Sequence, residues 1–324
     1  MIRINDDNVI LETVNDSMIL KIGAVAELLY YGEKLSGDSG YAQIGGDNTS
    51  SRNSADDYYS QRRLISSCGD GTNRETMISF TRADGCSIFR PKIKSCNILK
   101  RKPQIKCMRS SYGESECLQI IYEDEYSRVS VEQYFAVFEN SDVIATYIKL
   151  NNGGTQDISV KRLMSLQLDL GFGEFTALTL NGRYGLERHA EKCKITHGTF
   201  SISSYAGLSS NSANPYFQIT KEGARGYTLA TNLVYSGNHK EVADYSAVAG
   251  VRVMSGFNDY LCDYPLKAGC SLYSPEAIFV LRKTEDEVNF AMRTFVKEHI
   301  IRPEWQNTPR PVLINSWESF FFDF

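Results

Sequence analysis

The sequence predicts a mainly β protein, a large antiparallel β-sandwich that is followed by one helix. Three observations lead to this fold class. Apolar and polar residues alternate along many short segments, turns rich in Gly and Asn separate these segments, and the apolar period lengthens only after residue 283. Alternation with a period of two indicates strands with one buried face. Many short strands between turns are typical of a sandwich.

Each predicted strand lies between turn signals. Residues 77–80 and 87–89 alternate on either side of Asp84 and Gly85, a pair that accepts positive φ, so a hairpin is expected there. The Asn-Asn-Gly-Gly sequence at 151–154 is another clear turn signal. Further strands are expected at 128–137, 142–150, 158–170, 175–180, 227–235, 247–254 and 277–281.

A helix is predicted after the last of these strands. Thr284 is a residue type that caps helices, and Glu287 three positions later completes a capping box. Pro303 ends the run that follows. Apolar side chains recur three and four positions apart and give the helix one apolar face, which we expect to pack on the sandwich. They are Val288, Ala291, Met292, Phe295, Val296 and Ile300.

The last residues have a different character. Residues 310–317 form a largely apolar run, the pattern of a strand that is buried on both faces in a parallel sheet. Four of the last five residues are phenylalanines, whereas termini are commonly polar. Because a single parallel strand has no neighbour to pair with, we expect the sequence to stop just inside a second, parallel α/β domain.

Composition limits the classes of function. With 35 basic and 39 acidic residues the net charge is −4, whereas nucleic-acid binding needs a clustered basic excess. No basic leader with an apolar core and no window of about eighteen apolar residues occurs, so a soluble, cytoplasmic protein without a membrane partner is expected. The eight cysteines form no Cys-x-x-Cys pair and the four histidines are scattered, which disfavours a zinc site. Reduced, mostly buried thiols are expected.

Several segments along the chain carry a resemblance to a known family. Taken together and in order, they resemble the N-terminal part of family 36 glycoside hydrolases, the bacterial α-galactosidases or melibiases, over roughly residues 20–324. Any one segment alone would be a weak match, and their order makes the resemblance specific. The segments are 29–35 (LYYGEKL), 161–170 (KRLMSLQLDL), 181–189 (NGRYGLERH), 207–215 (GLSSNSANP), 232–238 (NLVYSGN), 310–318 (RPVLINSWE) and 322–324 (FDF).

The resemblance implies a domain organisation. Residues 1–281 would form the N-terminal β-sandwich (a supersandwich), 282–309 a linking helix segment, and 310–324 the start of a catalytic (β/α)8 barrel. A complete barrel takes about 250 residues. This chain would therefore hold only the first strand of a truncated barrel.

The resemblance also implies a chemistry, the retaining hydrolysis of terminal α-galactosides such as melibiose or raffinose by a nucleophile and an acid/base, both carboxyl groups. In the family the nucleophile follows a Lys-Trp-Asp motif. The tryptophans of this chain are Trp305 and Trp317, and neither precedes an aspartate. No catalytic residue is therefore assigned, and the 324-residue chain alone is expected to be inactive. No metal or organic cofactor is implied.

Two site residues follow from the resemblance. Trp317 aligns with the family tryptophan that walls the sugar pocket, where an indole face packs on the C–H face of galactose. The alternative is a core aromatic at a domain junction. Asp47, and more weakly Arg52, lie in the loop-like stretch 38–60 and match residues that reach a neighbouring subunit's pocket, which implies a homo-oligomer. A solvated polar loop is the alternative.

The chain departs from the family pattern in two segments. Tyr184 and Leu186 stand where a tryptophan and an arginine are usual, and 209–215 lacks both histidines of the family loop. If these segments line a neighbour's pocket, substrate preference or assembly differs from that of typical members. An α-N-acetylgalactosaminidase and a raffinose-type galactosyltransferase stay open. A different class of function also stays open, a non-catalytic carbohydrate-binding or oligomerisation β-sandwich module.

Overall fold

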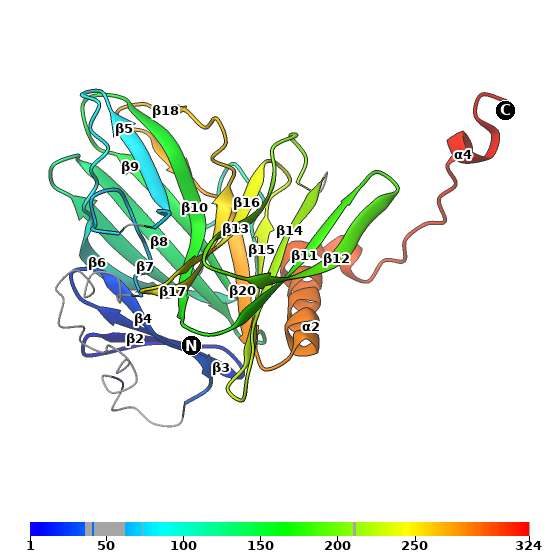
Figure 1. Cartoon of the computed structure of the whole chain (residues 1–324), viewed down its shortest axis with the longest axis horizontal. Coiled ribbons are helices and arrows are strands. Elements are labelled where there is room, and N and C mark those ends of the chain that lie inside the picture. Colours follow the sequence, from blue (N-terminus) through cyan, green and yellow to red (C-terminus); the bar gives the residue numbers. More distant parts are fainter. Residues whose placement is uncertain (36–40, 42–61, 73, 210–211, 324) are drawn as a thin grey trace.

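The computed structural model describes residues 1–35, 41, 62–72, 74–209 and 212–323, and three β-sheets make up most of it (Figure 1). Among these residues every pairing between named strands is antiparallel. The predicted fold class is therefore confirmed: the protein is mainly β, with sheets packed as a sandwich and a helix after them.

The chain begins with a four-stranded meander, in which each strand pairs with the next one along the chain. Successive side chains of a strand point to opposite faces. Leu11 and Leu20 therefore lie in the main core, while Ile10 and Ile19 form a separate cluster with Tyr41. The strands are β1 (Ile2–Asn5), β2 (Asn8–Glu12), β3 (Asp16–Ile22) and β4 (Ala26–Glu33).

The second sheet has six strands, in the order β13-β16-β17-β10-β18, with β5 also paired to β10. The long strand β10 joins its two parts, since its first half pairs with β5 and β18 and its second half pairs with β17. The bounds are β5 (Ile78–Arg82), β10 (Ile158–Gly171), β13 (Gly198–Ser204), β16 (His239–Ser246), β17 (Gly250–Phe257) and β18 (Tyr264–Leu266).

The third sheet has ten strands, in the order β12-β11-β14-β15-β20-β9-β8-β7-β6, with β19 also paired to β9. Strand β20 lies in its middle and connects β15 to β9, which are far apart in the sequence. The bounds are β6 (Lys92–Leu99), β7 (Ser115–Asp124), β8 (Val129–Phe138), β9 (Ile144–Asn152), β11 (Phe175–Arg183), β12 (Leu186–Ile195), β14 (Ala213–Lys221), β15 (Tyr227–Val234), β19 (Ser271–Tyr273) and β20 (Glu276–Arg282).

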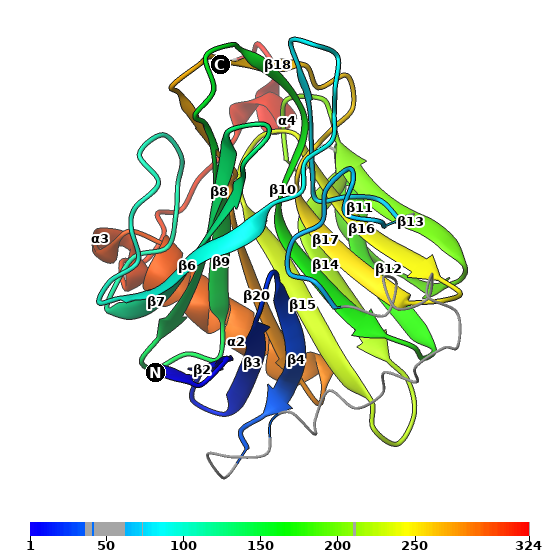
Figure 2. The same ribbon diagram turned by 90° about the vertical axis from the view of Figure 1, so that its left-hand side faces the viewer.

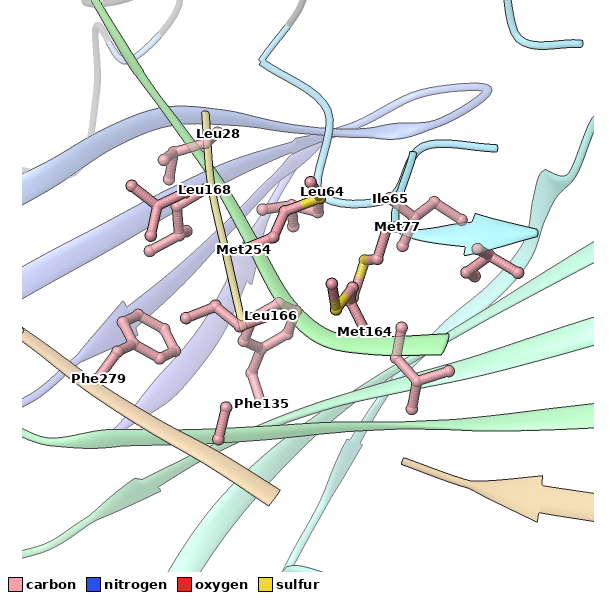
Figure 3. Packing of buried hydrophobic residues seen from close by; sticks show 14 of the residues in the cluster. Leu28, Leu64, Ile65, Met77, Phe135, Met164, Leu166, Leu168, Met254 and Phe279 are labelled. Carbon is pink, nitrogen blue, oxygen red and sulfur yellow. The ribbon is translucent and has the colours of Figure 1, made fainter. Parts of the chain in front are cut away.

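The three sheets share one hydrophobic core (Figure 3). Leu28 comes from β4, Leu166 from β10 and Phe279 from β20, and all three are buried. Phe135 from β8 and Met254 from β17 belong to the same cluster. Each large apolar side chain that is fully buried contributes about 1.5–3 kcal/mol, so this shared core holds the sheets together.

A helix covers the outer face of the ten-stranded sheet (Figures 1 and 2). In β20, Ala277 and Phe279 point into the main core, while Ile278 and Val280 point to the opposite face and pack in a second cluster with the helix. The helical elements are α2 (Glu285–Phe295), a π-helical turn η2 (Val296–Ile300), α3 (Pro303–Gln306) and α4 (Ser316–Phe320).

The predicted helix start and apolar face are confirmed. The Thr284 hydroxyl accepts from the backbone N–H of Glu287 (3.3 Å), and the Glu287 carboxylate accepts from the backbone N–H of Thr284 (3.0 Å). Val288, Met292 and Phe295 are buried against the sheet. The capping box and the three buried side chains therefore determine the direction in which the helix leaves the sandwich.

Most predicted strands are confirmed, with ends that differ by three residues or fewer; they are β8, β9, β10, β11, β15, β17 and β20. The predicted hairpin at 77–89 is wrong in its second arm. Residues 87–89 form no strand, because the Phe89 N–H donates to the carbonyl of Cys68 (2.8 Å) and Phe89 packs on Phe80. Strand β5 pairs with β10 instead.

The expected strand at 310–317 is not present. Residues 307–315 form no ladder with any described strand, and 316–320 form helix α4. A strand needs a neighbour for its N–H and C=O groups, and none of the described strands lies beside this segment. The side-chain oxygen (Oδ1) of Asn315 instead accepts from the backbone N–H of Trp317 (3.1 Å) and caps α4.

The cysteine prediction is wrong in one respect. All eight cysteines are unpaired in the structure, but only Cys117 is buried, where burial raises the pKa of its thiol to about 12. Four thiols are exposed, those of Cys68, Cys107, Cys193 and Cys270.

Candidate functional site

Trp317, the predicted wall of a sugar pocket, lies on the short helix α4. Half of its surface is exposed (50%), and its ring meets the rings of Phe321 and Phe322 edge-on, with centroids 5.7 and 5.1 Å apart. Figure 1 shows α4 well apart from the sheets. Trp317 is thus not part of the sandwich core, and its role at a sugar pocket stays a prediction.

The residues around Trp317 are also apolar and exposed. Val312, Leu313 and Ile314 lie before α4, and most of the surface of each is exposed to solvent. Phe320 at the end of α4 and Phe321 and Phe322 after it are also more than half exposed. A contiguous apolar surface of this kind usually marks a place where another structure packs. Asp47 and Arg52, and nearly all of the stretch 38–60, lie outside the described residues, so their predicted place in a partner's pocket stays a prediction.

Described residues from three of the segments that carry the resemblance meet beside His239, and we call this place the His239 junction (181–182, 207–209, 212–215 and 232–239). The His239 ring lies at its centre, with Nε2 2.6 Å from the carbonyl of Ser209 and 3.1 Å from that of Ala213. Its Nδ1 lies 2.7 Å from a carboxylate oxygen of Glu241. Both side chains are buried, so a histidine of β16 holds the loop before β14 in place.

Backbone hydrogen bonds complete the His239 junction. The Gly207 N–H donates to the side-chain oxygen of Asn238 (2.7 Å), and the Ser209 N–H donates to the carbonyl of Ser236 (3.1 Å). The Gly182 N–H donates to the carbonyl of Ser212 (3.0 Å) and ties in the end of β11. Residues 207, 209 and 212, which the structure describes, are therefore each tied to a neighbouring segment, and residue 212 is tied to the hairpin of β11 and β12.

The charge state of His239 follows from its surroundings. Burial disfavours the imidazolium, but the hydrogen bond and charge of Glu241, with the two carbonyls, outweigh burial and raise the pKa of His239. Burial raises the pKa of Glu241 as well, against the opposing effect of His239. Nε2 faces two carbonyls and must donate, so the pair holds a proton between Nδ1 and the carboxylate.

The sequence interpretation missed His239. Its signal was present, since residues i and i+2 of a strand point to the same face, and His239 and Glu241 are such a pair at a buried position of β16. Nothing local, however, indicates that their partners lie in the loop 207–215. That contact depends on the pairing of strands that are distant in the sequence.

The hairpin of β11 and β12 exposes the positions where the chain departs from the family pattern. Tyr184 lies at its tip with 88% of its surface exposed, and Leu186 is exposed beside it. Nine of the ten residues of β12 are exposed. The Glu187 carboxylate accepts from the backbone N–H of Gly185 (3.0 Å). The hairpin thus presents a polar strand and a tyrosine to solvent.

Metal binding and membrane insertion are two further possibilities for the described part of the chain. No group of three or more His, Cys, Asp or Glu side chains is placed there to hold a metal ion. None of the helices in that part is long and apolar enough to cross a membrane.

Comparison with protein-family models gives two matches that follow each other along the chain. The Glycosyl hydrolase family 36 N-terminal domain matches residues 25–267, and Melibiase matches residues 271–324. The first match runs from β4 to β18 and leaves out β1, β2 and β3 of the four-stranded sheet. The second begins at β19 and includes β20, the helix and Trp317.

Two curated proteins and one solved structure are similar to this chain. The bifunctional alpha-galactosidase/sucrose kinase AgaSK of Mediterraneibacter gnavus is 30% identical over 312 residues, which cover 91% of this chain and 33% of that protein. Alpha-galactosidase 1 of Pediococcus pentosaceus is 28% identical over 249 residues, 74% of this chain and 34% of that protein. The solved galactosidase domain of AgaSK has 27% identity and a TM-score of 0.90, over 100% of this chain and 48% of that one.

The chain spans about a third of the length of these curated relatives and about half of the solved domain. Its whole length superposes on one part of that domain, and a family model covers residues 25–267. The chain therefore belongs to glycoside hydrolase family 36, whose N-terminal domain it contains.

Proposed function

We propose that this chain is the N-terminal portion of a retaining α-galactosidase that hydrolyses terminal α-galactosides of the melibiose or raffinose type. The observation that carries the proposal is the order of the two family matches, first the family 36 N-terminal domain and then Melibiase. The similar proteins named above are α-galactosidases, which supports the same activity for the complete protein.

In this proposal the parts of the chain have different tasks. Residues 1–281 are the scaffold, 282–309 connect it to the next domain, and 310–324 begin a catalytic (β/α)8 barrel. Support comes from α2, whose buried side chains Val288, Met292 and Phe295 determine where the chain leaves the sandwich. The exposed apolar residues 312–314 and 320–322 would pack against the remainder of the barrel.

Trp317 would form part of the rim of the sugar pocket. Residues at the C-terminal ends of barrel strands line the active sites of such barrels. An indole offers an apolar face to the C–H groups of galactose and an N–H to a polar partner. The exposure of Trp317 in the described chain is compatible with this role, because its ring is not already packed in the sandwich.

We further propose that the protein is a homo-oligomer and that its sandwich supplies subunit contacts. Asp47 would reach the pocket of a neighbouring subunit. Supporting the contact role, the hairpin of β11 and β12 presents Tyr184 and an almost fully exposed strand. A cytoplasmic location is part of the proposal, and the four exposed, unpaired cysteines agree with it.

The chemistry itself would be carried by residues outside this chain. A retaining glycosidase places two carboxyl groups about 5–5.5 Å apart, one to attack the anomeric carbon and one to protonate the leaving oxygen. The two tryptophans of this sequence lack the Lys-Trp-Asp context of the family nucleophile. We therefore expect no turnover by residues 1–324 alone.

A pair of assays tests the proposal. Purified residues 1–324 are incubated with p-nitrophenyl α-galactoside, and a chimera joins the same residues to the remaining part of the AgaSK galactosidase domain. We expect no p-nitrophenol from the first protein, and from the chimera hydrolysis with retained anomeric configuration by NMR. Turnover by residues 1–324 alone, or a folded chimera that cleaves only another sugar, would contradict the proposal.

The chimera also tests the role of Trp317. Trp317→Ala is expected to raise KM or lower kcat/KM by about tenfold or more, since it removes a stacking surface. Trp305→Ala is the matched control, because Trp305 has a similar exposure (44%) but is not aligned with the pocket wall. Equal kinetics of the two variants would exclude Trp317 from the pocket.

A further inference from the structure

We propose that the sandwich carries a second binding site, a cleft for a neutral oligosaccharide beside the first half of β10. We call it the Arg162 cleft, and Arg162, Asp259, Tyr235, Phe257, Tyr264 and Asn238 are the residues on which the argument rests. This inference does not depend on the proposed hydrolase activity, because the described chain alone forms the cleft.

The cleft consists of two adjoining cavities. Their volumes are about 520 and 470 Å³, and both are lined by Lys161, Arg162, Asp259 and Cys262. Pockets for small ligands commonly have about 300–1,000 Å³. The cavities therefore adjoin along these four residues, which come from β10 and from the segment that follows β17.

One half of the cleft is charged but internally balanced. The Nε of Arg162 donates to Asp259 Oδ2 (2.6 Å), and the Lys240 ammonium lies 3.0 Å from Asp259 Oδ1. The guanidinium of Arg162 is also 2.8 Å from Glu75 Oε2. Arg162 and Lys240 thus face two carboxylates. The other cations that line this half are also paired, Lys161 with Asp263 (2.9 Å) and Arg74 with Asp169 and Asp244 (3.6 and 3.3 Å). An ion entering the cleft would meet both signs, so the arrangement favours a neutral ligand.

The same half offers acceptors and donors to hydroxyl groups. Burial tends to raise the pKa of Asp259, but Arg162 and Lys240 outweigh it and lower that pKa, so the carboxylate stays an acceptor. Glu75 is held by Arg162 (2.8 Å) and lies 3.7 Å from the Lys240 ammonium, so its carboxylate lies beside the same two cations. A sugar hydroxyl both donates and accepts. It therefore suits a surface in which carboxylates and guanidinium N–H groups alternate.

The other half of the cleft is aromatic. The rings of Tyr235 and Phe257 stand perpendicular to each other with centroids 5.2 Å apart, and Tyr264 lines the same cavity with about half of its surface exposed. Asn238 lines the same cavity, and its side-chain oxygen accepts from the Gly207 N–H (2.7 Å), so the donor that this side chain can offer to a ligand is its amide NH₂. Aromatic faces with an adjacent amide suit the C–H face and the hydroxyls of a sugar ring.

A second pair of tyrosines extends this surface. The rings of Tyr205 and Tyr260 lie 5.2 Å apart, and each is about two-thirds exposed. Asn258, which lines the cleft, accepts from the Tyr260 N–H (2.9 Å) and donates to the carbonyl of Ser204 (2.9 Å). The tyrosine pair is thereby fixed next to the cleft. Two neighbouring aromatic surfaces, one for each of two sugar rings, suit an oligosaccharide better than a monosaccharide.

The test measures binding to the purified 324-residue chain. Saturation-transfer NMR and calorimetry would be carried out with three neutral trisaccharides: raffinose, maltotriose and cellotriose. At least one is expected to bind, and Tyr264→Ala and Asn238→Ala should each weaken it about tenfold or more. Tri-galacturonic acid, which is charged, is expected to bind at least about tenfold more weakly than that trisaccharide. Thermal unfolding verifies that each variant is folded.

Two further variants locate the binding. Tyr126→Ala is the matched control, because Tyr126 is an exposed tyrosine outside the cleft, and it should bind like the wild type. Trp317→Ala should also bind like the wild type. No binding of any neutral trisaccharide, binding that is lost only with Trp317→Ala, or equal binding of the charged sugar would overturn the proposal. None of these outcomes bears on turnover by the chimera, so the two proposals fail separately.

Discussion

Asp169 of β10 and Arg252 of β17 lie opposite each other on neighbouring strands, and their buried side chains form a bidentate ion pair. The Nε of Arg252 donates to one carboxylate oxygen (2.7 Å) and Nη2 donates to the other (2.9 Å). Arg74 lies 3.6 Å from the same carboxylate and also reaches Asp244. A charged group therefore links residues 74, 169, 244 and 252 near the end of β10.

Loss of Arg252 is expected to destabilise the protein strongly. Arg252→Met leaves the carboxylate of Asp169 buried, and among the described residues Arg74 (3.6 Å) is then the cation that remains beside it. Removal of one partner from a buried ion pair costs about 3–5 kcal/mol, and the two side chains are only 4% and 3% exposed. Urea unfolding measures the free energy of unfolding of each variant.

Lys94→Met is the control. Its partner Glu123 is 2.6 Å away, but this ion pair is exposed, so the free energy of unfolding should fall by about 1 kcal/mol or less. Similar losses for both variants would contradict the prediction.

Asp16 is expected to make the fold less stable as the pH rises. Burial raises the pKa of its carboxyl to about 7, against the opposing effect of Arg282, and its Oδ2 makes no hydrogen bond within the described residues. The folded state then binds the proton more tightly than the unfolded chain, whose carboxyl has a pKa of about 4. The free energy of unfolding therefore falls between about pH 4 and about pH 7.

Asp16→Asn tests this pH dependence, since the amide has the same shape and does not titrate. Between about pH 4.5 and about pH 7.5 the wild type should lose on the order of 1–3 kcal/mol more than the variant. Urea unfolding at both pH values measures the difference. Asp84→Asn, at an exposed turn, serves as the control and should keep the wild-type profile. Parallel profiles of the wild type and Asp16→Asn would show that Asp16 does not titrate in this range.

Phe295 is expected to be the main anchor of helix α2. It is buried, and its ring meets Phe138 edge-on with centroids 4.9 Å apart. Phe295→Ala should lower the free energy of unfolding by about 3–5 kcal/mol. Phe290 lies on the same helix with 65% of its surface exposed, so Phe290→Ala is a matched control with a change within about 0.5 kcal/mol. Equal effects would mean that α2 does not depend on its packed face.

The sequence predicted those elements whose signals are local. Thr284 and Glu287 form a capping box within four residues, and the structure contains it. β12 was missed because nine of its ten residues are exposed, so it has no buried face to produce alternation. The arm at 87–89 was wrongly predicted for another reason. Phe89 hydrogen-bonds to Cys68, a partner that no local pattern indicates.

The same distinction between local signals and contacts with distant segments applies to the candidate site. Trp317 could be selected because it lies within a recognisable motif, although the segment before it is not the strand that its apolar run suggests. The His239 junction could not be predicted, since it depends on three segments that only the sheet pairing brings together. The Arg162 cleft likewise combines residues from β10 with residues nearly a hundred positions later.

His239 is expected to be essential for the position of the loop 207–215. His239→Ala removes the hydrogen bonds to Ser209 and Ala213 and leaves Glu241 buried with Ser255 (3.3 Å) as its remaining partner. We expect a loss of about 3–5 kcal/mol in the free energy of unfolding, and faster proteolysis within the loop.

His239→Gln keeps one N–H donor but cannot bond both to the carbonyls of Ser209 and Ala213 and to the carboxylate of Glu241. Its free energy of unfolding should therefore lie between those of the wild type and His239→Ala. His189→Ala, on exposed β12, should change the free energy by no more than about 0.5 kcal/mol. Should His239→Ala match that control in stability and in cleavage of the loop, the junction would be held by its backbone hydrogen bonds alone.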